Sequence, residues 1–102
     1  MKNARTCPSG YRTIGNKCKT IVIFRKWKGK DGDVIALFPD VKADFEGNIM
    51  SYEHIGQHGA ADYNHVVSKT RLATKKEFRP LLKELDDIGY KKSELEIRKK
   101  RL

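Results

Sequence analysis

The sequence has no long apolar run, only two cysteines and no acidic residue in its first 30 positions. A transmembrane helix needs about 18 or more consecutive apolar residues, so we expect no membrane partner. The start, Met1 to Arg5, lacks the apolar segment of a signal peptide. We therefore look for a partner in solution.

The net charge of +9 on 102 residues is unevenly distributed. Residues 1–30 carry nine Lys or Arg and no acid, residues 31–66 carry one Lys and seven acids, and residues 67–102 carry twelve Lys or Arg and six acids. The length predicts one domain. We expect a basic N-terminal arm with both cysteines over 1–19, a single domain over 20–98 and a basic tail over 99–102.

The segment Thr20 to Phe24 is β-branched and aromatic, and apolar on both faces, which predicts a central strand covered on each side. A turn around Asp31-Gly32 joins it to a second strand over 34–38, which Pro39 is expected to end. The arm is expected to be irregular or a small hairpin that turns at Gly15-Asn16.

Later segments predict a third strand, two helices and a final strand. The third strand covers 48–55 and stops at the polar, glycine-rich segment 56–59, and a short helix over 63–68 is capped by Asp62. The main helix runs from Lys75 to Ile88, with a capping box from Thr74 and Glu77, although Pro80 predicts a kink or a later start. The final strand, 94–98, is expected to point Leu95 and Ile97 inward.

These elements predict an α+β fold. It has a small antiparallel or mixed sheet of three to four strands, with one main amphipathic helix packed on one face, in the order β-hairpin, strand, short helix, helix, strand. The second sheet face needs the short helix, the arm or another subunit, so a homodimer or a larger assembly is an alternative.

Several segments resemble a family of small uncharacterised proteins encoded by bacteria, phages and plasmids. They are Ile21-Val22-Ile23-Phe24-Arg25-Lys26, Ala36-Leu37-Phe38-Pro39, Ser51 to Asp62 (SYEHIGQHGAAD), Thr70 to Thr74 (TRLAT) and Glu84 to Tyr90 (ELDDIGY). The resemblance covers roughly 20–98 and implies a mobile genetic element and a cytoplasmic location, with the virion as the alternative. It implies no activity.

Tyr52, His54, Gln57 and His58 lie in the segment that looks most like a binding site. In an extended strand the two imidazoles would lie roughly 13 Å apart, so a metal site would require a tight loop and further ligands. We expect no metal and no cofactor. The structural reading is that these side chains bond loop carbonyls or a partner. If the chain is an enzyme, His54, His58 and Arg71 would cleave RNA without a metal.

Cys7 and Cys18 bracket ten residues and are candidates for a disulfide. In an oxidising compartment such a bond would be worth on the order of 3 kcal/mol. In a cytosol we expect reduced thiols instead.

Two basic segments are candidate binding residues because Lys and Arg near an aromatic ring suit a phosphate backbone and a stacked base. They comprise Arg25, Lys26, Trp27 and Lys28, and Arg98, Lys99, Lys100 and Arg101. No recognition-helix motif accompanies them, so binding would follow charge or shape.

We therefore predict a small phage-type or mobile-element accessory protein. It acts as a binding module for nucleic acid or an acidic protein surface, without catalysis. The alternatives are a metal-independent ribonuclease that uses His54 and His58, and a minor virion or assembly component.

Overall fold

A computed structural model of the chain describes residues 7–29, 32–54 and 57–100. Within these ranges its elements are β1 (Arg12–Ile14), β2 (Lys17–Trp27), β3 (Val34–Lys42), β4 (Ile49–Glu53), β5 (Gln57–Ala61), α1 (Tyr63–Lys69), β6 (Thr70–Leu72), α2 (Lys75–Asp87), the 3-10 helix η1 (Lys92–Glu94) and β7 (Leu95–Ile97). The α+β class agrees with the prediction. The predicted sheet of three to four strands is wrong, because seven strands join one sheet.

Strand β2 organises the sheet. It pairs antiparallel with β1, β3 and β6 and parallel with β7, while β3, β4 and β5 continue the sheet as antiparallel neighbours. A strand of 11 residues spans roughly 36 Å, so different stretches of its length pair with different strands. The length of β2, which begins at Lys17 and not at Thr20, explains the larger sheet.

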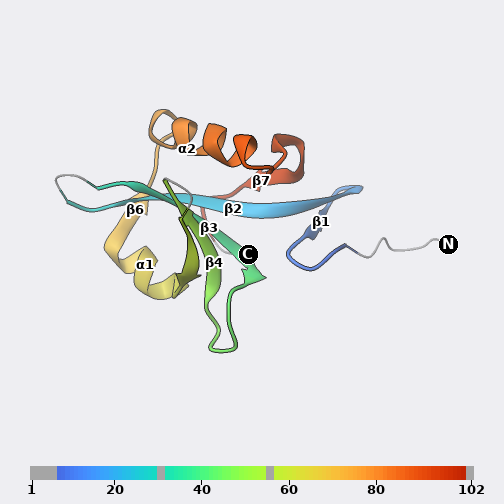
Figure 1. Cartoon of the computed structure of the whole chain (residues 1–102), viewed down its shortest axis with the longest axis horizontal. Helices are drawn as coiled ribbons and strands as arrows, with labels where there is room; N and C mark the ends of the chain where they lie inside the picture. The colour runs from blue at the N-terminus through green and yellow to red at the C-terminus, as the bar shows by residue number, and fades with distance from the viewer. Residues whose placement is uncertain (1–6, 30–31, 55–56, 101–102) are drawn as a thin grey trace.

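Both faces of the sheet are covered by helices, as the apolar run Ile21 to Phe24 predicts (Figure 1). Val22 and Phe24 pack with Leu81 and Leu85 of α2 on one face. Ile21 and Ile23 pack on the other face, where Val66 of α1 completes the core. Of the three covers considered for the second face of the sheet, which were the short helix, the arm and another subunit, the structure shows the short helix α1.

One predicted strand end and one predicted loop are wrong. Strand β3 continues through Pro39 to Lys42, and its register with β4 shifts between Phe38 and Lys42. Such an irregularity is where a sheet tolerates a residue without a backbone donor. The third strand does end before the segment expected to stop it, at Glu53, but residues 57–59 of that segment enter β5 and form no loop, with Gly59 opposite Ser51. Asp31 and Gly56 of the predicted turns lie outside the described residues.

The helices begin and end as their capping residues predict. Asp62 caps α1 by accepting from the His65 N–H, and the Thr74–Glu77 capping box begins α2. Gly89 follows α2 with φ +119°, a conformation that favours glycine. Pro80 lies inside α2 without ending it or delaying its start, and its ring is exposed.

The N-terminal segment is attached to the domain. Cys7 and Cys18 form a disulfide, and the Arg12 guanidinium makes a two-pronged ion pair with Asp40 at 2.7 and 2.9 Å. The turn at Gly15 joins β1 to β2, as expected for a small hairpin. In the described part of the chain, none of the helices has the length and apolarity needed to cross a membrane.

Candidate functional site

The two histidines singled out in the sequence lie on the same face of the sheet. Tyr52 of β4 pairs with His58 of β5, and His54 follows two residues after Tyr52, so all three side chains face α2. The Tyr52 hydroxyl donates to the Glu84 carboxylate, and His54 Nδ1 lies 2.5 Å from the other Glu84 oxygen. His58 Nε2 lies 2.9 Å from the Tyr90 hydroxyl. The structure therefore satisfies each of these polar groups within the fold.

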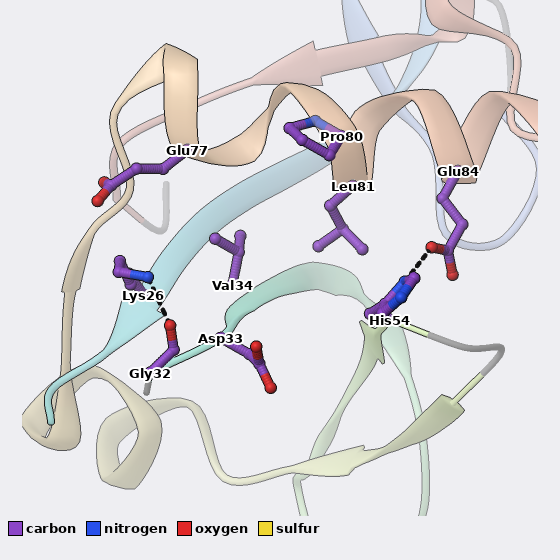
Figure 2. Close-up of a pocket in the computed structure, with 9 residues that line it drawn as sticks. All are labelled: Lys26, Gly32, Asp33, Val34, His54, Glu77, Pro80, Leu81 and Glu84. Atoms are coloured by element: carbon purple, nitrogen blue, oxygen red, sulfur yellow. Dashed lines mark hydrogen bonds and ion pairs between the residues drawn. The ribbon is translucent and has the colours of Figure 1, made fainter. Parts of the chain in front are cut away.

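A groove of about 320 Å³ adjoins this cluster, between α2 and the β2–β3 hairpin (Figure 2). Its charged lining consists mainly of carboxylates, from Asp33, Glu77 and Glu84, and the Lys26 ammonium donates to the Gly32 carbonyl. Carboxylates repel a phosphodiester, although the charge of Glu77 is offset by its ion pair with Arg71. The groove therefore offers little to the ribonuclease hypothesis.

Arg71, the cation of that hypothesis, is bonded to one of these carboxylates. Its guanidinium makes two bonds to Glu77, at 2.6 and 2.8 Å. Gln57 begins β5, and its side chain lies outside the described part of the structure. Among the described residues there is no group of three or more His, Cys, Asp or Glu that could hold a metal ion.

The first predicted basic cluster does not form one patch. Along β2, the side chains of Arg25 and Trp27 point to one face of the sheet and that of Lys26 points to the other. Arg25 bonds to Thr70, and the Trp27 indole N–H donates to Glu53 at 3.0 Å. Lys28 is exposed at the end of the strand. Three of the four predicted residues, Arg25, Lys26 and Trp27, are thus bonded inside the fold.

The main cationic surface lies on α2 instead. Its cations Lys75, Lys76, Arg79 and Lys83 are all exposed. The last turn holds no basic residue and contains two aspartates, Asp86 and Asp87. A helix dipole favours acids in the first turn and bases in the last. In α2, Glu77 follows this rule, whereas Lys75 and Lys76 in the first turn and Asp86 and Asp87 in the last oppose it, and Lys83 forms an ion pair with Asp87 at 3.4 Å. A local rule broken in this way is typical of a surface kept for a partner.

The C-terminal tail extends this surface. Lys75 lines a second groove together with Arg98 and Lys99, which follow β7. Arg98 forms an ion pair with Glu96 at 3.2 Å, whereas Lys99 and Lys100 are exposed. Arg101 lies outside the described residues. We call this the α2–tail surface: Lys75, Lys76, Arg79, Lys83, Lys99 and Lys100.

Sequence reasoning named the tail cations but missed those of α2. The signal was present: Lys76, Arg79 and Lys83 recur at helical spacing, on the side of the helix opposite Phe78 and Leu81. Taken alone, that pattern is typical of any solvated helix face. The cations of α2 differ from an ordinary solvated face because two aspartates, Asp86 and Asp87, occupy the last turn of the same helix.

The Glu77 carboxylate gives stability a dependence on pH. Hydrogen bonds from Arg71, and then from the Thr74 N–H, lower the pKa of Glu77 from 4.5 to about 2. A lowered pKa in the folded state stabilises the protein above the unfolded pKa, and this contribution is lost as pH falls from about 4.5 to 2. We expect Glu77→Gln to flatten the loss of stability over this range. Urea midpoints at pH 6, 4 and 2.5 measure it, with the exposed Glu46→Gln as control; equal slopes for both variants would contradict the assignment.

Comparison of the chain with models of known protein families, with curated proteins and with solved structures gives no match. The function is therefore argued from the geometry of the chain itself.

Proposed function

We propose that this chain is a small nucleic-acid-binding module that contacts the phosphate backbone through the α2–tail surface. The observation that carries the proposal is the set of four exposed cations on α2 beside the cationic tail, two of which, Lys75 and Lys76, stand in the first turn where the helix dipole disfavours a cation. Charges that cost the isolated helix stability become favourable when an anion lies on them.

The expected binding is led by charge. Lysine and arginine on an exposed helix contact phosphates and release counterions, at a slope of about 0.9 in log affinity against log salt for each phosphate neutralised on duplex DNA. The chain has no motif for reading base edges, so we expect weak dependence on nucleotide sequence. An accessory protein of a mobile element, the setting that the resemblance implies, remains a prediction.

The ribonuclease alternative has less support. Glu84 and Tyr90 bind the two imidazoles, and the adjoining groove is lined by carboxylates. An acidic protein surface would fit the same cations as a nucleic acid, and the experiment below separates these two partners.

The test compares two triple variants that remove the same charge. Lys76→Ala/Arg79→Ala/Lys83→Ala changes the α2–tail surface, whereas Lys17→Ala/Lys28→Ala/Lys69→Ala removes three exposed cations from other elements. Affinity for labelled single-stranded and duplex oligonucleotides is measured by fluorescence anisotropy from 50 to 300 mM salt. We expect the α2 variant to lose at least tenfold in affinity and about 2 to 3 in salt slope.

The control variant should lose little beyond the effect of net charge. An equal loss in both variants would show that the total charge acts without a surface, which overturns the proposal. Absence of binding to either oligonucleotide at 50 mM salt would also overturn it and would favour an acidic protein partner.

A further inference from the structure

Two apolar features are exposed among the described residues. Phe45, at the tip of the β3–β4 hairpin, is 96% exposed, and its contact is with the Lys42 ammonium over the ring. Leu72 and Ile97 are 38% and 44% exposed at the groove that also holds Lys75. Ile97 lies on the same side of β7 as the buried Leu95, but Ile97 is not itself buried, which corrects the sequence prediction. Exposed apolar surface of this kind marks interaction sites.

The tip that carries Phe45 is held in one conformation by its own hydrogen bonds. The Asp44 carboxylate accepts from the backbone N–H groups of Glu46 and Asn48 and from the Asn48 amide, at 2.8 to 3.2 Å. The Ala43 N–H donates to the Asn48 carbonyl and closes the loop. A loop ordered before binding loses little conformational entropy when it docks. The tip therefore presents Phe45 as a preformed anchor.

The groove has the size and lining that a phenyl ring needs. Its volume is about 460 Å³, and Phe24 and Phe78 stack within it at 4.5 Å between ring centroids. A cavity of about 150 Å³ already accommodates benzene. Leu72 and Ile97 form exposed apolar parts of its lining.

The charges around the two features are complementary. Asp44 and Glu46 flank Phe45 in the sequence, and the Lys42 ammonium lies over its ring at 4.7 Å from the centroid, so the tip carries two acids and one cation. The groove is lined by Lys75, Arg98 and Lys99. With Lys42 counted, the tip keeps a net negative charge, which favours a protein with a basic-rimmed apolar pocket over a nucleic acid. This chain carries such a pocket itself.

We propose that the chain associates with a second copy of itself, with the Phe45 tip of one copy inserted into the groove lined by Phe78, Leu72 and Ile97 of the next. Tip and groove are different surfaces, so the contact is heterologous and produces a ring or an open chain of copies. Lys75 and Lys99 line the groove and also belong to the α2–tail surface, whereas Lys76, Arg79 and Lys83 do not line it. The contact rests on other observations than the proposed function, although the two surfaces share these two lysines.

The experiment is sedimentation velocity at rising protein concentration. The wild type should exceed the monomer mass of 11.7 kDa as concentration rises. Phe45→Ala removes the tip anchor and Lys75→Glu/Lys99→Glu reverses the groove charge, so each variant alone should stay monomeric. Mixed together they should form a 1:1 dimer, because one retains the groove and the other retains the tip.

The mixture is the decisive measurement. A monomeric wild type, a Phe45→Ala variant that associates like the wild type, or a mixture that stays monomeric overturns the proposal. Circular dichroism checks that each variant is folded. As a second control, Glu46→Lys is added to the Lys75→Glu/Lys99→Glu chain, where it should restore self-association because a basic tip then faces an acidic groove. Failure of that restoration, with both chains folded, also counts against the contact. Phe45→Ala should keep the wild-type affinity for oligonucleotides, which separates this result from the proposed function.

Discussion

Substitution of Phe38 by alanine is expected to lower the free energy of unfolding by about 3–5 kcal/mol. Phe38 is fully buried in the core between the sheet and α2, and its ring stacks on Tyr90 at 5.2 Å between centroids. Removal of the ring leaves a cavity that the β-sheet backbone cannot close. A domain of this size has a total stability of about 5–15 kcal/mol, so the loss would take a large part of it.

The matched control is Phe45→Ala, the same chemical change at a position that is 96% exposed. At low protein concentration, where copies do not meet, we expect this variant to unfold within about 0.5 kcal/mol of the wild type. Urea unfolding followed by circular dichroism measures both variants. Equal losses would contradict the assignment of Phe38 to the core and of Phe45 to the surface.

The sequence predicts those parts of the fold that depend on local or strongly periodic signals. Ile21 to Phe24 is apolar on both faces and is the centre of the sheet. The T-x-x-E pattern at Thr74 and the glycine after Ile88 mark the two ends of α2. Each of these signals acts over a few residues, so a single sequence contains the information.

The missed strands depend on pairing between distant segments. Thr70 to Leu72 has no strand pattern of its own, and β6 forms because Arg25 to Trp27 offers it an open edge. The segment Gln57 to Ala61 contains Gly59 and small alanines, which have low strand propensity, yet β4 holds it as β5. Pairing of this kind overrides local preference.

The candidate site was predictable only in part, because some of its contacts are local in the chain and others join distant segments. His54 and His58 are close in the chain and lie on one face, but their partners Glu84 and Tyr90 are about 30 residues away. Only the tertiary packing of α2 on the sheet shows that these imidazoles are already bonded. The cations of α2 were visible in the sequence, and the position of the tail beside them was not.

Arg25 gives the second large effect, and it distinguishes a structural cation from a binding one. Its guanidinium donates to the Thr70 hydroxyl at 2.6 Å, to the Thr70 carbonyl at 2.8 Å and to the Val67 carbonyl at 3.4 Å. Thr70 is 2% exposed, so water does not readily replace this donor. Arg25→Met retains the apolar stem and removes only the charged donor. We expect a loss of about 2–3 kcal/mol in the free energy of unfolding.

The control is Arg79→Met, the same substitution on the exposed side of α2. It should change stability by less than about 0.5 kcal/mol while it weakens oligonucleotide binding. Folded Arg25→Met should bind oligonucleotides like the wild type, because in the wild type the Arg25 guanidinium contacts Thr70 and Val67 instead of a partner. The opposite pattern, with binding lost at Arg25 and stability unchanged, would place the phosphate contact on β2. The two arginines therefore separate the charge that holds the fold together from the charge that the fold presents to a nucleic acid.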